Sequence, residues 1–130
     1  MGYALTTTLD DPFADVLAAV RSALGEQGFG VLTEIDLAAT LREKIGAEID
    51  PQVILGACRP PLAHAAVQAE PSIGLLLPCN VVVRQVAGGR VVVEALNPDV
   101  MVELTHNGAL ADLAREAEER LSAALAALTG

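Results

Sequence analysis

The chain has 130 residues, of which 52% are hydrophobic and 19% charged, so we expect a single domain over residues 1–130 with its own core. Its net charge of −9, with only eight Lys and Arg residues, excludes a surface that tracks nucleic-acid phosphates. With two Phe, one Tyr and no Trp, the chain also lacks the aromatic side chains that stack on single strands, so we expect no nucleic-acid partner.

The first third of the chain predicts a strand, a helix and a second strand. Residues 3–9 alternate like a strand, and Asp10-Asp11-Pro12 predicts a helix start with Asp as the cap and the proline in the first helical position. Residues 29–35 predict the second strand. The helix between them ends at Gly25 and Gly28, and its apolar face consists of Phe13, Val16, Leu17, Val20 and Leu24.

The middle of the chain predicts a third strand between two short helices. Asp36 predicts the cap of a helix that turns Leu37, Leu41 and Ile45 inward and stops at Gly46. Residues 52–57 form a compact apolar run typical of a strand. Pro60-Pro61 predicts the start of a helix over residues 62–68, which Pro71 brings to an end.

The last part of the chain predicts a hairpin and a long helix. Residues 75–86 and 90–96 are Val-rich and meet across Ala87-Gly88-Gly89, which predicts two paired strands. Asn97-Pro98 stops the second strand, and we expect an extended piece through Leu104. The last helix begins at Asn107-Gly108, and its apolar stripe consists of Leu110, Leu113, Ala117, Leu121, Ala124 and Leu128.

This order of elements favours a two-layer α+β sandwich with a mixed, largely antiparallel sheet and helices on one face. The alternative is a flavodoxin-like α/β fold, because single strands and helices alternate over most of the chain. No strand, however, is followed by a Gly-rich phosphate loop that leads into a helix.

Several spaced motifs resemble the domain-of-unknown-function 302 family over about residues 13 to 104. They are Gly28-Phe29, Val31-Leu32, Glu34-Ile35-Asp36, Ile54-Leu55-Gly56-Ala57-Cys58, Pro60, Ala63, Leu77-Pro78-Cys79-Asn80-Val81, Asn97-Pro98 and Met101. The resemblance implies a small prokaryotic protein with an α+β fold, frequent self-association and no established activity. The chain departs from the family's pattern at Arg59, where Asn is more usual after the first cysteine.

The two cysteines lie in similar frames, each where an apolar run meets a proline and a polar residue. Cys58 precedes a predicted helix start, whose backbone N–H groups and dipole can stabilise a thiolate, whereas burial of Cys79 in its apolar run would raise the pKa of that thiol. Antiparallel neighbouring strands would bring the two close, and parallel strands would keep them apart. We predict a ligand-binding site at Cys58, Arg59, Cys79, Asn80 and Asn97, with Arg59 favouring an anion.

Other site chemistry finds little support. Neither His64 nor His106 stands at a recognised metal-ligand spacing from a cysteine, so we expect no metal and no cofactor. The start of the chain lacks a signal-peptide pattern, and no apolar run is long enough to span a membrane. Two cysteines without an export signal favour a reducing compartment, and we expect a cytoplasmic protein without a membrane partner.

Three kinds of function remain open. The first is a homodimeric module that binds a small ligand near the two cysteines. The second is a thiol-dependent redox enzyme, with Cys58 as nucleophile and Cys79 as resolving thiol. The third is a purely structural subunit that self-associates through a sheet edge or the last helix. The sequence does not decide whether the protein is an enzyme.

Overall fold

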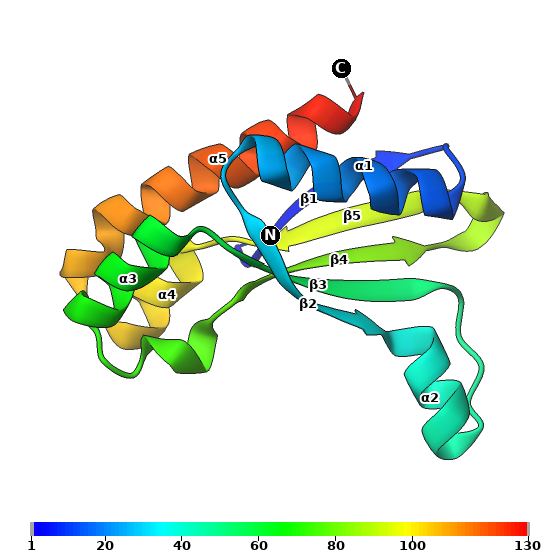
Figure 1. Cartoon of the computed structure of the whole chain (residues 1–130), viewed down its shortest axis with the longest axis horizontal. Helices are drawn as coiled ribbons and strands as arrows, with labels where there is room; N and C mark the ends of the chain where they lie inside the picture. The colour runs from blue at the N-terminus through cyan, green and yellow to red at the C-terminus, as the bar shows by residue number, and fades with distance from the viewer. Residues whose placement is uncertain (1, 130) are drawn as a thin grey trace.

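The computed structural model describes residues 2–129, and in it one five-stranded sheet carries helices mainly on one face (Figure 1). The strands are β1 Ala4–Leu9, β2 Gly30–Asp36, β3 Gln52–Cys58, β4 Cys79–Gln85 and β5 Val91–Leu96. Their order across the sheet is β1-β5-β4-β3-β2, and every neighbouring pair is antiparallel. The predicted α+β fold is confirmed, with a sheet that is antiparallel rather than mixed, and the flavodoxin-like alternative is excluded.

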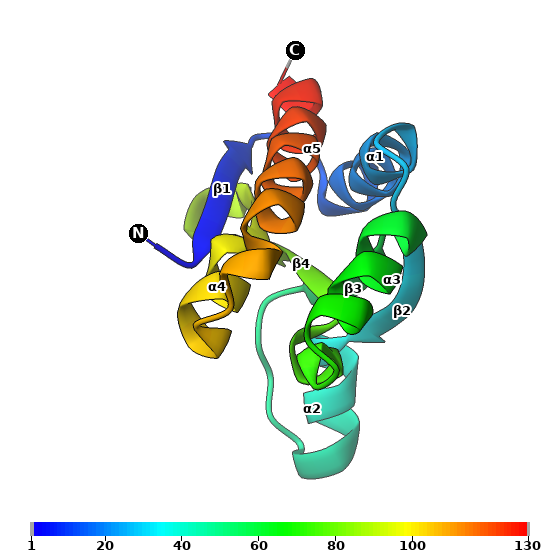
Figure 2. The ribbon, with the colours of Figure 1, turned by 90° about the vertical axis from the view of Figure 1, so that its left-hand side faces the viewer.

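Five α-helices accompany the sheet in the described part of the chain. They are α1 Phe13–Glu26, α2 Leu37–Ile45, α3 Pro60–Ala69, α4 Asp99–Thr105 and α5 Ala111–Thr129. Helices α1 and α5 lie over the sheet, α3 and α4 gather at one end, and α2 projects from the other end (Figure 1). Figure 2 looks at the molecule from the α3 and α4 end. Within residues 2–129, no helix has the length and apolar character that crossing a bilayer requires.

Two clusters of buried side chains form the core. The larger one joins the inward-facing residues of the sheet, such as Leu55 and Val83, to Val20 of α1 and Leu121 of α5. Because successive side chains of a strand point to opposite faces, alternate residues of the central strands face the helices and join this cluster. The smaller cluster lies at the α3 and α4 end and consists of Ala66, Ile73, Cys79, Met101 and Leu110. Cys79 therefore belongs to the packing between the sheet and these helices.

The helix boundaries confirm one predicted cap and correct another. The Ala39 N–H donates to the Asp36 carboxylate at 2.9 Å, so Asp36 caps α2 as predicted. The prediction of an Asp cap for α1 was wrong, because Pro12 itself is the N-cap residue and no side chain caps that end. Gly25 lies within the last turn of α1 rather than beyond it, and Gly28 follows the helix with φ +83°.

The packing prediction for α2 was wrong. None of its residues is buried, and Ile45 is 74% exposed. Figure 1 shows the reason, since α2 extends past the ends of β2 and β3 and has no second layer against which to pack. An apolar spacing of i, i+4 and i+8 describes one side of a helix, and that side is buried only where another element covers it.

Two segments around the hairpin also differ from the prediction. Strand β4 begins at Cys79 rather than at residue 75, because Ile73–Leu76 forms a turn of 3₁₀ helix that leaves Leu75 88% exposed. The piece expected to be extended is the helix α4. Its start is fixed by Asn97, whose side-chain oxygen accepts from the Asp99 N–H at 3.0 Å, and by Pro98 in the helical region. The hairpin turn is confirmed, with positive φ at Gly88 and Gly89.

The helices of residues 2–129 leave most of the other face of the sheet uncovered (Figure 1). The strand register places one row of side chains across this open face, in the order Ile35, Ile54, Val82, Glu94 and Thr6. Ile35 at the β2 edge is 46% exposed, and the Arg84 Nε donates to the Glu94 carboxylate at 2.7 Å. The open face thus combines an apolar row with one pair of opposite charges.

Candidate ligand cavity

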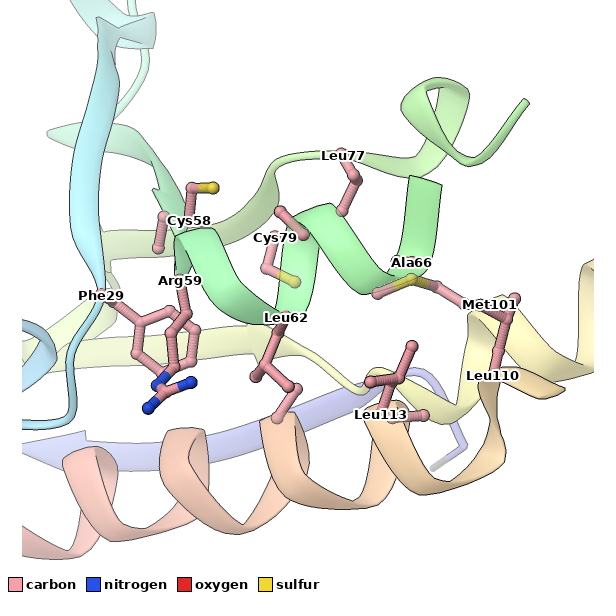
Figure 3. Close-up of a pocket in the computed structure, with 14 residues that line it drawn as sticks. Phe29, Cys58, Arg59, Leu62, Ala66, Leu77, Cys79, Met101, Leu110 and Leu113 are labelled. Atoms are coloured by element: carbon pink, nitrogen blue, oxygen red, sulfur yellow. The ribbon is translucent and has the colours of Figure 1, made fainter. Parts of the chain in front are cut away.

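A cavity lies where α3 faces α5 above the adjoining ends of β3 and β4, and we call it the α3–α5 cavity (Figure 3). Its enclosed part measures about 40 Å³, and the volume is about 490 Å³ when the open mouth is included. Short side chains on both helices and on β3 leave this space, since five of the lining residues are alanines. The lining consists of Phe29, Ala57, Cys58, Arg59, Leu62, Ala63, Ala66, Leu77, Cys79, Met101, Leu110, Leu113, Ala114 and Ala117.

The wall of the cavity is held in place by Asn107, which precedes the 3₁₀ turn Gly108–Leu110 that leads into α5. Its side-chain nitrogen donates to the Ala69 carbonyl at 3.0 Å and to the Glu70 carboxylate at 2.9 Å. Its side-chain oxygen accepts from the Ala109 N–H at 2.9 Å. One amide therefore ties the end of α3 to the start of α5, which fixes the two helices that face each other across the cavity.

The strand register brings the two cysteines into neighbouring positions on adjacent strands. Ala57 is the partner of Cys79 in the antiparallel pair β3 and β4, so Cys58 stands one residue out of register. Because successive side chains of a strand point to opposite faces, the two thiols point to opposite sides of the sheet. In Figure 3 the Cys58 side chain rises above its strand, whereas the Cys79 side chain descends toward α5. This arrangement does not favour direct exchange between the two thiols.

The surroundings of the thiols differ. Cys79 is buried. This burial, and to a smaller extent the nearby Cys58, raises the pKa of the Cys79 thiol to about 11. Cys58 is half-buried and precedes the start of α3, but Pro60 and Pro61 carry no N–H there. The N–H groups of the next two residues both donate to the Arg59 carbonyl at 3.0 Å. The free donors expected beside Cys58 are therefore absent or already occupied.

Arg59 is the N-cap residue of α3 and the one charged residue in the lining within residues 2–129. Its side chain is only 20% exposed, and its Nε atom is buried without a hydrogen-bond partner in the described part of the chain. A terminal nitrogen of the guanidinium lies 3.5 Å from the Glu116 carboxylate. The same carboxylate oxygen accepts from the Arg120 Nε at 3.1 Å. Two guanidiniums therefore share one carboxylate at this end of the cavity.

Gly28 provides the space in which the Arg59 side chain lies. A Cβ atom at Gly28 would come within 3.1 Å of the Arg59 Nε and 3.7 Å of its Cδ. The φ of +83° at Gly28 also belongs to the left-handed region, which other residues rarely adopt. A glycine after α1 thus allows the Arg59 side chain to lie against the backbone beside Phe29.

The five predicted site residues fall into two groups. Cys58, Arg59 and Cys79 line the α3–α5 cavity, whereas Asn80 and Asn97 do not. Asn80 is exposed and stands opposite Gly56 in the register, with its side chain on the open face of the sheet. Asn97 serves as the cap of α4, and its backbone N–H donates to the Tyr3 carbonyl at 2.8 Å. Asn80 therefore belongs to the end of a strand and Asn97 to the start of a helix, and neither side chain belongs to the cavity.

The histidines lie outside the cavity. His64 is exposed on α3, and His106 is exposed at the end of α4, where it adopts the left-handed conformation with φ 54°. In the described part of the chain, no three side chains of the His, Cys, Asp or Glu types gather in a way that could hold a metal ion.

The sequence interpretation missed much of the cavity wall. The missed residues include Leu62, Ala66, Met101, Leu113 and Ala114 of the lining, and also the charged pair Glu116 and Arg120, which lies outside the lining beside Arg59. The pair stands at an i, i+4 spacing on α5, on a charged side of the helix whose pattern is typical of a solvated face. The available signal was the repeat of alanines at i, i+3, namely Ala63 and Ala66 on α3 and Ala114 and Ala117 on α5.

Comparisons with known proteins agree with this fold. No curated protein matches the chain. Among solved structures, the chain is similar to an uncharacterized conserved DUF302 protein from Bacillus stearothermophilus, with a TM-score of 0.89 and 28% sequence identity. That match covers 97% of this chain and 98% of the other. The profile of the family described as domain of unknown function DUF302 matches residues 5–128, and the chain therefore belongs to the DUF302 family.

Proposed function

We propose that this protein is a homodimeric small-ligand-binding module, and that the α3–α5 cavity takes the apolar end of a small molecule. The observation that carries the proposal is the cavity itself, an opening into the core at one end of the sheet that is lined almost entirely by apolar side chains. Ligand pockets are typically concave and mostly apolar, with a few polar groups that fix orientation. Arg59 supplies the polar group here.

The size of the cavity limits the ligand. An apolar cavity of about 150 Å³ is known to take benzene, and the enclosed part here, about 40 Å³, is roughly a quarter of that size. It therefore accommodates the end of a short alkyl chain, while the rest of the ligand occupies the open mouth. Dinucleotides and other large cofactors are too big for the enclosed part.

Binding of 1-hexanol, a neutral probe with an alkyl chain, tests the cavity. We expect saturable chemical-shift changes in two-dimensional amide NMR spectra that centre on Ala66, Leu110 and Ala114. The variant Ala114→Leu fills the cavity and should abolish these changes, while Ala123→Leu, an exposed position on the same helix, should leave them intact. If overpacking unfolds the first variant, Ala63→Leu narrows the cavity from the α3 side at a half-buried position. Changes that do not saturate, or that survive filling of the cavity in a folded variant, would refute the proposal.

The second copy in the homodimer covers the open face of the sheet. The apolar stripe of α5 packs into the chain's own core through Leu121 and Ala124, which leaves it unavailable to a partner. The open face instead offers the row Ile35, Ile54 and Val82. Beside this row, Arg84 and Glu94 carry opposite charges, so a two-fold axis allows each copy's arginine to pair with the other's glutamate.

Light scattering tests the dimer. At micromolar concentration the native chain should give about twice the 13.4 kDa chain mass. Val82→Lys places a charge in the middle of the apolar row and should give the monomer mass, whereas Ala123→Lys, at an exposed position of α5 outside the open face, should remain dimeric. A native monomer mass across this range would contradict the homodimer and leave the cavity proposal standing.

A further inference from the structure

We propose that the ligand of the α3–α5 cavity is a short-chain monocarboxylate, whose head group binds Arg59 in the cavity mouth. This inference rests on the proposed ligand-binding function and adds the chemical class of the ligand. Four observations carry it: the under-satisfied guanidinium of Arg59, the local charge around it, the polarity of the cavity along its length, and the small enclosed volume.

The guanidinium of Arg59 lacks hydrogen-bond acceptors. A guanidinium carries five N–H donors, and one that is largely removed from water needs acceptors within the protein or a ligand. The Nε atom has no partner among residues 2–129, and the contact from the terminal nitrogen to Glu116 is 3.5 Å long. Charge-assisted hydrogen bonds are shorter, about 2.7–2.9 Å. The Nε atom lies against Gly28 and is closed to solvent, so a carboxylate in the mouth would bind the terminal nitrogens, whose contact with Glu116 is long.

The local charge favours a head group with a single negative charge. Arg59 and Arg120 together carry two positive charges, and among residues 2–129 the one carboxylate that contacts both is Glu116. The excess of one positive charge exists although the whole chain carries −9. A doubly charged phosphate exceeds this single positive charge and would leave one negative charge uncompensated beside Glu116. A carboxylate matches both the excess charge and the planar fork of the guanidinium.

The polarity of the cavity changes along its length. Figure 3 shows the Arg59 guanidinium at one end, near Phe29, and Met101, Leu110 and Leu113 at the other. Leu62 and Ala66 of α3 form the wall between these ends. A ligand with a charged head and an apolar tail fits this order in one orientation only. Because the enclosed part measures about 40 Å³, only about the last one or two carbons of the tail lie in it, and the rest of a short chain lies in the mouth.

Three probes of equal chain length test the head group: hexanoate, 1-hexanol and hexylammonium. With the native protein at pH 7, we expect hexanoate to bind roughly 10- to 100-fold more tightly than 1-hexanol, as charge-assisted hydrogen bonds to a buried guanidinium would give. Hexylammonium should bind more weakly than 1-hexanol. Added salt should weaken the binding of hexanoate and leave that of 1-hexanol unchanged.

Substitutions test whether Arg59 causes the preference for hexanoate over 1-hexanol. Arg59→Met keeps the length of the side chain but removes its charge, so hexanoate should lose its advantage while 1-hexanol still binds. Glu116→Gln removes the competing carboxylate at a partly exposed position and should tighten the binding of hexanoate by roughly two- to fivefold. Arg90→Met is the matched control, because Arg90 pairs with Asp10 and is absent from the cavity lining. If Arg59→Met does not fold, the response to Glu116→Gln still decides the test.

The outcomes separate the two proposals. If neither hexanoate nor 1-hexanol binds in the cavity, the ligand-binding function itself fails. If 1-hexanol binds but hexanoate gains no advantage, or if the advantage persists in a folded Arg59→Met variant, the function stands and the monocarboxylate inference is overturned. Preferential binding of hexylammonium overturns it as well.

Discussion

Replacing Gly56 by alanine is expected to lower the free energy of unfolding by about 1–3 kcal/mol or more. Gly56 lies in the middle of β3, and a Cβ atom there would collide with the Thr33 hydroxyl and would come within 2.8 Å of the Pro78 ring. Thr33 is part of the neighbouring strand β2, and Pro78 leads into β4, so neither can move away without disturbing a strand. Urea unfolding at pH 7 measures the change.

Gly25→Ala provides the matched control for this substitution. It adds the same methyl group inside α1, where nothing lies within 4 Å of the new Cβ atom. Alanine is the better helix former, so the control should raise the free energy of unfolding by about 0.5–1 kcal/mol. The two substitutions are therefore expected to change the free energy of unfolding in opposite directions. A Gly56→Ala protein as stable as the native chain would mean that Thr33 and Pro78 yield without cost.

The sequence predicted those parts of the fold in which local signals and packing agree. Periodic apolar residues identified α1 and the long helix α5, and the two Val-rich runs around Gly88-Gly89 identified the hairpin. The errors have two causes, a local helix start and a missing packing partner. The run Val100–Val102 is apolar enough for a strand, but Asn97 and Pro98 start a helix instead. The apolar side of α2 remains uncovered because that helix extends past the sheet.

The candidate site was predictable only in part, for a similar reason. Cys58 and Arg59 could be assigned to the end of a strand and the start of a helix from their own neighbours, and Cys79 to the strand that follows. The register between β3 and β4 then determined that the two thiols face opposite sides, and a register is not encoded in either strand alone. Glu116 contacts Arg59 from 57 positions further along the chain, which no local pattern reveals.

The buried thiol of Cys79 should make the fold less stable in alkali. Burial, and to a smaller extent Cys58, raises the pKa of Cys79 from 9.0 to about 11. Below pH 9 the thiol is protonated in both the folded and the unfolded chain, and it makes no difference to stability. Between pH 9 and 11 the unfolded chain releases the proton while the folded chain keeps it, so stability falls as the pH rises. A shift of this size corresponds to about 2–3 kcal/mol above pH 11.

Urea unfolding at several pH values between 8 and 11.5 measures this loss, and two alanine variants assign it. Cys79→Ala lowers the stability at every pH because it leaves a cavity, but its further decline above pH 9 should be smaller than that of the native chain by about 2–3 kcal/mol. Cys58→Ala should retain most of the native decline, since burial is the larger cause of the shift. The other ionisable groups are common to the native chain and Cys79→Ala, so they cancel in that comparison. Parallel curves for the native chain and Cys79→Ala would show that the Cys79 thiol ionises as readily in the folded chain as in the unfolded one, and that water reaches this thiol in the folded chain.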